Sequence, residues 1–572
     1  MKLKLDGRWA ADNPIRLEGA RLMTAPITGE KCRLKTHALA FTGIPHSTPL
    51  FLDYLSYVPG ARAFYPRPAR FSEWVKDEAP RVRYDEVRRR KVSEILERQN
   101  RAWGASAKTL ASIDRLRRGA VVAVTGQQVG LFGGPLFSTF KALTAVKLAE
   151  EATAAGVECV PVFWLATEDH DLAEVNHVSL LSEAGLPERL LAESRGAEDA
   201  PVETVRLGPE IEAVVERAAW LLGESEVTAW LREAYSSGET MSSAFARLFA
   251  RLFGEWGVIL LDPADKEFHE LAKPLFRAAI ERSVELDQAL LARGKALEAA
   301  GYHQQVKVTA ATTLLFQIKQ GARTVVRRRS NGANGGEFLV GEERIQAGEL
   351  LSRIDGEAEK FSANVLLRPV VQDYLLPTLA YTGGAAEVAY FAQAGVVYEK
   401  LMGRVTPVLP RFSATLVESK AKRILSRYGL GLADLFHGPE KLQEVMAQRA
   451  LPHDLQARFG EAKAAVEKSL ASVRESLARL DPTLVEAAGR SAAKMGYQLT
   501  KLEARAARAE LRRNEIITRH ADALSHALFP HKALQEREIA GVSFVARYGP
   551  GLLRDLYETI RTDCHDHQVI EV

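Results

Sequence analysis

Four ionisable residues follow one apolar segment of the chain in direct succession. The segment VECVPVFWLAT is followed by Glu168, Asp169, His170 and Asp171. Crowded ionisable groups shift one another's pKa values, often into the range that acid and base chemistry needs. We therefore predict His170 as a general base or as a hydrogen-bond donor to a transferred acyl or phosphoryl oxygen, with Asp169 as a second catalytic residue. Trp164, within the apolar segment, and Glu168 are predicted to contact substrate.

The same cluster has two other interpretations. Asp169, His170 and His177 could hold a divalent metal, or a carboxylate pair could carry Mg²⁺ together with a nucleotide. The plainer interpretation is that Asp171 caps the following helix and that Asn176 and His177 end it. The predicted site therefore includes no metal ligand, and Mg²⁺ with a nucleotide stays open.

A glycine-rich turn precedes this cluster. In TGQQVGLFGGPLFSTFK, Gly130, Gly133 and Gly134 lie between an apolar segment and a helix predicted to begin near Pro135. Glycines there let backbone N–H groups approach a ligand, and a helix N-terminus favours phosphate or carboxylate. The spacing is neither GxGxxG nor GxxxxGK[ST], because the nearest lysine, Lys141, lies two turns into the helix. The pattern thus argues against hydride transfer and P-loop hydrolysis.

Two glutamines stand at the start of the same turn. Gln127 and Gln128 follow the apolar segment directly, at the strand end where α/β sheets bind ligands. We predict Gln128 as a catalytic residue, Gln127 as a substrate-binding residue, and the three glycines as a nucleotide or anion site. The alternative is that the glycines only shape a tight turn from strand to helix.

A second glycine pair, Gly383 and Gly384, opens another predicted helix. It lies in VLLRPVVQDYLLPTLAYTGGAAEVAYFAQ, and Glu387 there could recognise an amine or could instead satisfy N–H groups of the first helical turn. In the later PRFSATLVESK, Arg411 is predicted to contact phosphate or carboxylate, together with Ser413. The substrate-binding residues predicted from the first of these stretches are Gln372, Asp373, Tyr381, Glu387 and Tyr390.

Strands and helices alternate around these motifs. VVAVTG and VECVPVFWLAT are continuous apolar segments on either side of a helical one, which is typical of a βαβ unit whose parallel strands are buried on both faces. We predict an α/β fold with a Rossmann-like, doubly wound parallel sheet in residues 1–413, interrupted by insertions at about 195–255 and 265–362. Further elements are strands at 256–263, 364–372 and 404–410, helices near 211–222 and 268–300, and a β-hairpin that turns at Gln320 and Gly321.

A coiled-coil domain is predicted for residues 414–534. Apolar residues recur at intervals of three and four from Leu455 to Leu480, and a similar stripe runs from Met495 to Leu524. Two long antiparallel helices are the simplest arrangement. Because so narrow a seam can also pair with a second copy, we expect a homodimer. Residues 535–572 are predicted to form a helix, a Gly-Pro break and a second helix that pack back on the core.

Bulk composition excludes several classes of protein. The 572 residues exceed the size of a single core, and 76 Lys and Arg against 73 Asp and Glu give no overall field that would attract nucleic acid or a membrane. Three widely spaced cysteines without a CxxC pair indicate neither a disulfide framework nor a thiolate zinc site. Without a signal peptide or a long apolar run, the chain is expected to be cytoplasmic.

Five motifs together resemble one known family. TGQQVGLFGGPLF, PVFWLATEDHDLAEVNH, NVLLRPVVQDYLLPTLAYTGGAAEVAYFAQ, PRFSATL and LQEREIAGVSFVARYGP are similar to the cysteine ligase family of bacillithiol biosynthesis, termed BshC. The resemblance runs from about residue 120 to the C-terminus and includes LFLDYLSYVPGARAFYP near the start. It implies a Rossmann-type core with two connecting insertions and a dimeric coiled-coil domain. It also implies that L-cysteine is added to the amine of glucosaminyl malate, in the last step of the thiol's synthesis.

Amide formation from a free carboxylate needs activation, and adenylating relatives of this fold use ATP for it. The resemblance therefore implies ATP or another nucleotide, although FGGP at 132–135 replaces the HxGH signature of those enzymes and no KMSKS equivalent is present. In this hypothesis the glycine turn cradles phosphate and His170 or Gln128 stabilises developing charge. Asp169 or Glu387 then orients the amine.

Two other functions remain open. The chain could be a nucleotidyltransferase-like enzyme that activates another small carboxylic acid, which substrate competition would reveal. It could also be a nucleotide-binding coiled-coil assembly protein without catalysis. The charged residues gathered at two neighbouring strand ends argue against the second alternative.

Overall fold

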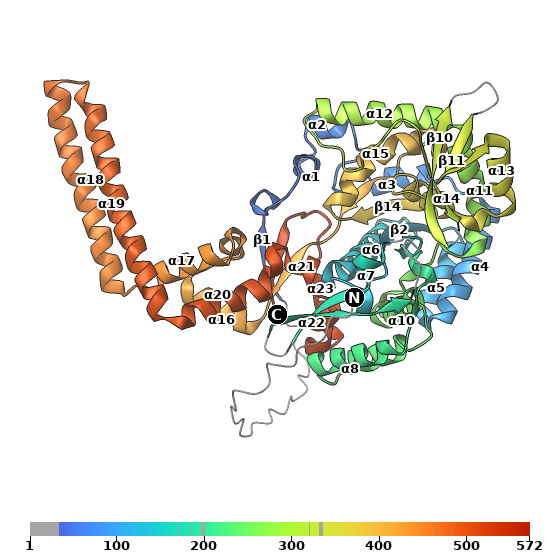
Figure 1. Cartoon of the computed structure of the whole chain (residues 1–572), viewed down its shortest axis with the longest axis horizontal. Coiled ribbons are helices and arrows are strands. Elements are labelled where there is room, and N and C mark those ends of the chain that lie inside the picture. Colours follow the sequence, from blue (N-terminus) through green and yellow to red (C-terminus); the bar gives the residue numbers. More distant parts are fainter. Residues whose placement is uncertain (1–33, 170, 183–184, 196–200, 320, 331–335) are drawn as a thin grey trace. The chain divides into compact units, whose positions relative to one another are not determined.

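The computed structural model describes residues 34–572 except 170, 183–184, 196–200, 320 and 331–335 (Figure 1). Its central element is a sheet of five parallel strands in the order β15-β14-β2-β3-β8. β3 is buried along its whole length, as expected of a strand covered on both faces. The predicted Rossmann-like core is thus confirmed. The strands are β2 (Val121–Gln127), β3 (Cys159–Leu165), β8 (Ile259–Leu261), β14 (Thr378–Gly383) and β15 (Val408–Pro410).

The register brings four strand ends to one edge of this sheet. Gln127 at the end of β2 pairs with Leu165 at the end of β3, and Gly383 at the end of β14 pairs with Pro410 of β15. Two long helices, α6 and α15, start just beyond this edge and are buried over most of their length. The helices next to the sheet are α4 (Glu86–Ala102), α5 (Ala107–Arg117), α6 (Leu136–Ala154) and α15 (Ala385–Met402).

A second, antiparallel sheet lies in the segment between β8 and β14. Its strand order is β12-β11-β10-β9-β13, and the predicted hairpin is confirmed as β9 and β10. The helical segment predicted near 268–300 is confirmed, and it consists of two helices that meet at Arg282. The elements are α11 (Lys266–Glu281), α12 (Ser283–Ala299), β9 (Thr312–Lys319), β10 (Ala322–Ser330), β11 (Glu337–Val340), β12 (Glu343–Gln346), α13 (Ala347–Gly356) and β13 (Phe361–Ala363).

The strand predicted over 364–372 is wrong, because this segment forms helix α14 (Arg368–Leu375). Asn364 Oδ1 accepts hydrogen bonds from the N–H groups of Leu366 and Leu367, which starts a helical turn, and a proline near the helix start fits its first turn. A short apolar run that is buried all round has no period from which strand and helix can be told apart.

The segment between β3 and β8 is a smaller helical insertion with short strands. The predicted helix near 211–222 is confirmed as α8. Its elements are α7 (Leu172–Val175), β4 (His177–Leu181), β5 (Pro187–Leu191), β6 (Ser194–Arg195), β7 (Arg206–Leu207), α8 (Glu210–Leu222), α9 (Glu226–Ala234) and α10 (Met241–Phe253). Before the core lie β1 (Lys35–Leu39), α1 (Pro49–Leu55), α2 (Pro59–Arg62) and α3 (Val75–Glu78).

Helices α18 (His453–Leu480) and α19 (Leu484–Arg513) lie side by side as an antiparallel pair (Figure 1). Lys463 Nζ lies 2.6 Å from a carboxylate oxygen of Glu503 across the pair. The predicted coiled coil is therefore confirmed. The second apolar stripe, predicted from Met495 to Leu524, is divided between two helices. The first helix ends before Asn514, whose side chain caps the next helix, α20 (Glu515–Leu528). Before the pair lie α16 (Ser419–Tyr428) and α17 (Pro439–Arg449).

The C-terminal segment forms short helices and one strand. The predicted helix, Gly-Pro break and second helix are confirmed as α22 and α23. The chain then adds β17, which pairs with β1 and β16 in a three-stranded sheet that the sequence did not predict. The elements are β16 (Ala414–Val417), α21 (Gln535–Glu538), α22 (Gly541–Tyr548), α23 (Gly551–Thr559) and β17 (His567–Glu571). Over the described ranges, no helix has the length and apolarity that crossing a bilayer requires.

Candidate functional site

A cavity of about 340 Å³ opens at the carboxyl edge of the parallel sheet. Open α/β sheets bind their ligands beyond this edge, so the cavity is the candidate active site. β2, β3, α6, α14, α15 and the C-terminal α21 all contribute to it. The lining residues are Gly126, Gln127, Gln128, Phe137, Lys141, Trp164, Ala166, Val365, Arg368, Tyr381, Gly384, Ala386, Glu387, Tyr390, Arg411 and Arg537.

The predicted site residues divide into two groups. Those that line the cavity are Gln127, Gln128, Trp164, Tyr381, Glu387, Tyr390 and Arg411. Those that lie outside its lining are Glu168, Asp169, Gln372, Asp373, Ser413, Gly130, Gly133 and Gly134. His170 lies outside the described residues, so its predicted role stays a prediction.

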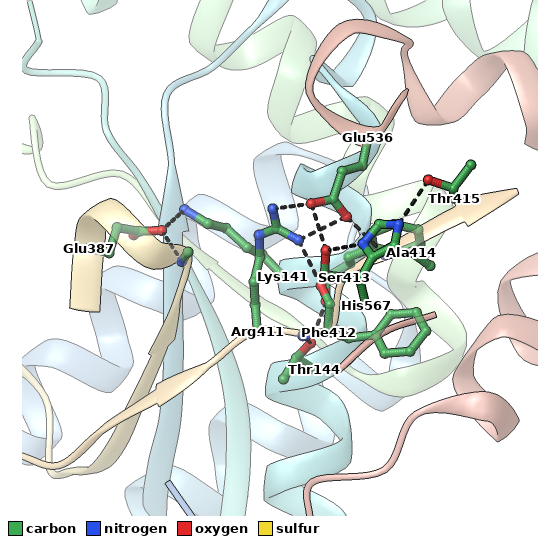
Figure 2. Close-up of polar contacts among 12 residues, drawn as sticks. Lys141, Thr144, Glu387, Arg411, Phe412, Ser413, Ala414, Thr415, Glu536 and His567 are labelled. Carbon is green, nitrogen blue, oxygen red and sulfur yellow. Dashed lines mark hydrogen bonds and ion pairs between the residues drawn. The ribbon is translucent and has the colours of Figure 1, made fainter. Parts of the chain in front are cut away.

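Lys141 is buried in the wall of the cavity and uses all three of its N–H donors. Its Nζ donates to the carbonyl oxygen of Gly126 and to Oε1 of Gln127, both at 2.8 Å, and lies 2.5 Å from Oε2 of Glu387 (Figure 2). Burial lowers the pKa of Lys141 to about 8, although the neighbouring Glu387 opposes this shift. At neutral pH the side chain is therefore a fixed, fully bonded cation.

Glu387 is the partner of this lysine and also holds the start of α15. Its carboxylate accepts hydrogen bonds from the N–H of Gly384 at 2.7 Å and from the hydroxyl of Tyr381 at 2.5 Å. Burial acts to raise the pKa of Glu387, but the Lys141 ammonium together with the hydrogen bonds from Tyr381 and Gly384 keeps this pKa below its ordinary value. Glu387 therefore accepts a hydrogen bond from the first turn of α15 and, at the same time, forms an ion pair with Lys141.

Three guanidinium groups complete the polar lining. Arg368 donates to the hydroxyl of Tyr390 at 2.6 Å, and Arg411 binds Glu536 through two nitrogens at 2.7 and 3.1 Å. Arg537 is exposed and forms no ion pair with any residue that the structure describes. With Lys141, the lining has four basic side chains and a single carboxylate, that of Glu387. This surplus of positive charge suits an anionic ligand.

Arg411 is held in place by a buried network behind the cavity. Figure 2 shows its guanidinium between the Lys141–Glu387 pair and Glu536. Glu536 also accepts from the Ser413 hydroxyl at 2.9 Å, and His567 bridges Ser413 and Thr415 at 2.7 and 2.8 Å. Burial lowers the pKa of His567 to about 4, so this imidazole is neutral at neutral pH. Ser413 thus positions Glu536, which in turn positions Arg411.

Gln128 connects the cavity to the acidic cluster that follows β3. Its amide nitrogen donates to Asp169 at 2.8 Å and to Glu174 at 2.7 Å, and Arg323 lies 3.8 Å from the other oxygen of Asp169. Asp171 accepts from the N–H of Glu174, so it caps α7 as the plainer interpretation proposed. Asp169 is therefore one hydrogen bond away from a residue of the cavity wall.

A second group of acids lies behind Asp169. Glu168 accepts from His269 Nε2 at 2.8 Å. Burial, with Asp262 and Glu168 nearby, raises the pKa of Glu203 to about 8, and burial raises the pKa of Asp262 to about 6. Near this edge of the sheet, Glu203 therefore keeps its proton at neutral pH, whereas Asp262 loses its proton just below neutral pH. Each of Glu203, Asp262 and His269 went unpredicted, although Asp262 stands at the end of a predicted strand.

The first glycine turn is covered by other parts of the chain. Gly133 and Gly134 have φ values of 88° and 69°, which favour glycine. A Cβ on Gly133 would lie 3.2 Å from the ring of Phe249 in α10. The N–H of Leu136, the first residue of α6, donates to the carbonyl oxygen of Ile539 at 2.8 Å. The C-terminal segment thus occupies the position that the sequence suggested for an anion.

Gln372 and Asp373 are buried on α14 rather than placed at a strand end. Gln372 donates to Asp373 at 2.9 Å, and the hydroxyl of Tyr398 donates to the other oxygen of Asp373 at 2.5 Å. Because these groups satisfy one another, they fix α14 against α15. Among the described residues, no three His, Cys, Asp or Glu side chains are placed to hold a metal ion together.

Three charged lining residues, Lys141, Arg368 and Arg537, were not among the predicted site residues. Lys141 had a detectable signal, since it is a lone charge in the apolar first half of α6. Arg368 was expected on a strand, and Arg537 lies in the LQEREIAG motif, to which no role was assigned. Only the folded chain brings these three cations to one cavity.

Two family models match almost the whole described chain. The model described as "Bacillithiol biosynthesis BshC, N-terminal Rossmann-like domain" matches residues 34–412, and the corresponding "C-terminal coiled-coil domain" matches 414–572. The chain belongs to the BshC family. The BshC family assignment agrees with the resemblance in the sequence motifs, and it makes the chain an enzyme of the ligase class in bacillithiol biosynthesis.

Curated relatives named "Putative cysteine ligase BshC" match most of its length. The protein of Koribacter versatilis is 49% identical over 92% of this chain and 98% of its own length. The protein of Solibacter usitatus is 39% identical over the same shares, and that of Salinibacter ruber is 34% identical over 96% of this chain and 100% of its own.

Proposed function

We propose that this enzyme forms an amide between the carboxyl group of L-cysteine and the amine of glucosaminyl malate, as the last step of bacillithiol biosynthesis. The observation that supports this most is the cavity lining, which has four basic side chains and one carboxylate. Both reactants carry carboxylates, and an activated cysteine carries phosphate as well. The names of the relatives support cysteine as the amino acid.

The malate part of the acceptor fits the guanidinium groups. Arg537 is free to bind a carboxylate, since it forms no ion pair within the described part of the chain. The side chain of Arg368 donates hydrogen bonds only to a phenol and an amide in that part, so it also has no carboxylate in direct contact. Guanidinium forks bind carboxylates with two parallel hydrogen bonds, which gives both affinity and orientation.

The reaction needs a leaving group on the cysteine carboxyl carbon, and ATP or another nucleotide, consumed as a cosubstrate with Mg²⁺, would supply it. The basic lining fits the phosphate that such activation places there. The sugar amine then attacks the carboxyl carbon, forming the C–N bond while the bond to the leaving group breaks and takes its electron pair. Asp169, next to Gln128, accepts the amine proton, and the Lys141–Glu387 pair stays ionised.

The direct test is to incubate the purified chain with L-cysteine, glucosaminyl malate and ATP. Mass spectrometry should detect the condensed thiol together with AMP, if activation passes through an adenylate, or ADP, if it passes through an acyl phosphate. Competition with other amino and hydroxy acids tests the alternative of another small acid. Absence of the amide with every nucleotide would contradict the proposed reaction.

The coiled coil also supports a homodimer. Several apolar side chains towards the joined ends of α18 and α19 are more than one third exposed, and a second copy could cover them. They are Val473, Leu480 and Leu484. Light scattering after size exclusion should give twice the mass of 63.0 kDa. Replacing Leu480 and Leu484 with Glu should shift the mass to that of the monomer, and a monomeric wild type would contradict the proposal.

A further inference from the structure

A second, much smaller cavity adjoins the candidate active site. It shares Trp164 and Arg368 with the large cavity and has a free volume of about 10 Å³, which is room for one group the size of a water molecule. Apart from Arg368, Glu168, His269 and the Trp164 N–H, its wall is apolar. The apolar residues are Pro263, Phe268, Ala272, Phe276, Ala363, Val371 and Leu375.

Two buried nitrogen atoms of this wall have no hydrogen-bond partner among the described residues. They are Nε1 of Trp164 and Nδ1 of His269, whose side chains are 1% and 7% exposed. His269 Nε2 lies 2.8 Å from Glu168, so in the neutral ring Nε2–H donates to this carboxylate and Nδ1 is left as an acceptor. The residues of this wall thus have one N–H donor and one ring-nitrogen acceptor that no other described residue satisfies. Unpaired polar atoms at such burial are costly unless a ligand satisfies them.

We propose that this small cavity binds the side-chain thiol of the amino-acid substrate. The proposal rests on the proposed function, because it places the cysteine side chain next to the site of amide formation. The Trp164 N–H donates to the sulfur, and the S–H donates to Nδ1 of His269. The rings of Phe268 and Phe276 provide the sulfur–aromatic contacts that thiols favour over hydroxyls. Arg368 and Trp164 line both cavities, so a thiol in the small cavity lies next to the large cavity in which the amide would form.

This arrangement predicts how the enzyme selects cysteine. 2-Aminobutyrate has a methyl group in place of the thiol, fills the same volume, and leaves both nitrogens unpaired. Serine brings a smaller hydroxyl whose burial in an apolar wall costs free energy that one or two hydrogen bonds only partly restore. A site built around such polar contacts should prefer cysteine to 2-aminobutyrate on the order of 100-fold in kcat/KM.

Two variants each remove one contact. Trp164→Phe keeps an aromatic ring but loses the N–H, and His269→Gln retains a donor for Glu168 but loses the acceptor at Nδ1. Their matched controls are Trp220→Phe and His303→Gln, at exposed positions outside both cavities. In each site variant the preference for cysteine over 2-aminobutyrate should fall on the order of tenfold, while the controls keep the wild-type ratio. An unchanged ratio in both site variants would overturn the proposal.

Direct binding separates this proposal from the ligase reaction. Calorimetry with L-cysteine and with 2-aminobutyrate needs no turnover. Binding of cysteine that weakens in Trp164→Phe and His269→Gln, but not in their controls, supports the thiol pocket even if no amide is formed. If the wild type forms the amide from cysteine, serine and 2-aminobutyrate with equal efficiency, the ligase stands and the thiol pocket is wrong. Equal binding of cysteine and 2-aminobutyrate, or no binding of either, also overturns the pocket.

Discussion

Two turns of this enzyme have the same sequence pattern and different surroundings. Each leads from a parallel strand through a pair of glycines into a long buried helix, at Gly133–Gly134 before α6 and at Gly383–Gly384 before α15. The first is covered by α10 and by the carbonyl oxygen of Ile539. The second borders the cavity with Gly384 and Glu387. A glycine pair at a strand end therefore indicates a sharp turn, and the rest of the chain decides whether a ligand can reach it.

The largest effect is expected at the α15 turn. Lys141→Met leaves the Glu387 carboxylate buried without its cation, and breaking a buried ion pair in this way costs about 3 to 5 kcal/mol of unfolding free energy. Denaturant unfolding should show this loss, and amide formation should decrease on the order of 1,000-fold because the site loses its fixed cation. The double variant Lys141→Met with Glu387→Gln should regain most of the stability. A single variant as stable as the wild type would mean that the pair contributes nothing to the turn.

The next largest effect is expected when a positive charge of the cavity is removed and the length of the side chain is roughly kept. Arg537→Gln should raise KM for glucosaminyl malate about 10- to 100-fold, because one charged hydrogen-bonding partner of a carboxylate is lost. Thermal stability should stay unchanged, since Arg537 forms no ion pair within the described part of the chain. Arg513→Gln, an exposed position on α19, is the matched control. Equal KM values for the two variants would remove Arg537 from the site.

Alanine at one glycine of each turn compares the two turns directly. Gly133→Ala forces a non-glycine residue to a φ of 88° against Phe249, so it should cost about 1 to 3 kcal/mol of stability and leave KM unchanged. Gly384→Ala is at a φ of −76°, and its Cβ would meet only Glu387 and Arg411 at 3.6 and 3.7 Å. It should keep stability within about 0.5 kcal/mol and raise KM severalfold. A raised KM in Gly133→Ala and lost stability in Gly384→Ala would mean that the first turn binds the ligand and the second does not.

Sequence patterns predicted the core well and the site in part. VVAVTG and VECVPVFWLAT are apolar without interruption because both faces of their strands are buried, so β2 and β3 could be predicted. The segment at 364–372 failed because a short buried helix has the same uninterrupted pattern. In the site, Gln128 lies at the start of one glycine turn and Glu387 follows the other, and the sequence shows both turns. His269 and Arg537 reach the site from distant segments, and only tertiary packing brings them there.

The smallest effect is expected at Glu203, which lies near the same sheet edge but belongs to neither turn. It shows how large an effect is when no turn is changed. Glu203 has a pKa raised to about 8 from its usual 4.5, so the folded protein holds a proton that the unfolded chain releases between these values. Its contribution to stability is therefore lost as pH rises from about 4.5 to 8. Glu203→Gln should gain on the order of 2 °C in Tm relative to the wild type between pH 5 and pH 9, measured by differential scanning calorimetry. Parallel Tm profiles of the two proteins would contradict this assignment.

The central claim is that ligands bind at the Gly383–Gly384 turn and not at the Gly133–Gly134 turn. A crystal structure of the enzyme with the proposed amide product would test it most directly. We predict malate carboxylates within hydrogen-bonding distance of Arg368 or Arg537, and the thiol between Trp164 and His269. Product bound against Gly133 and Gly134, with Ile539 displaced from the start of α6, would contradict the account.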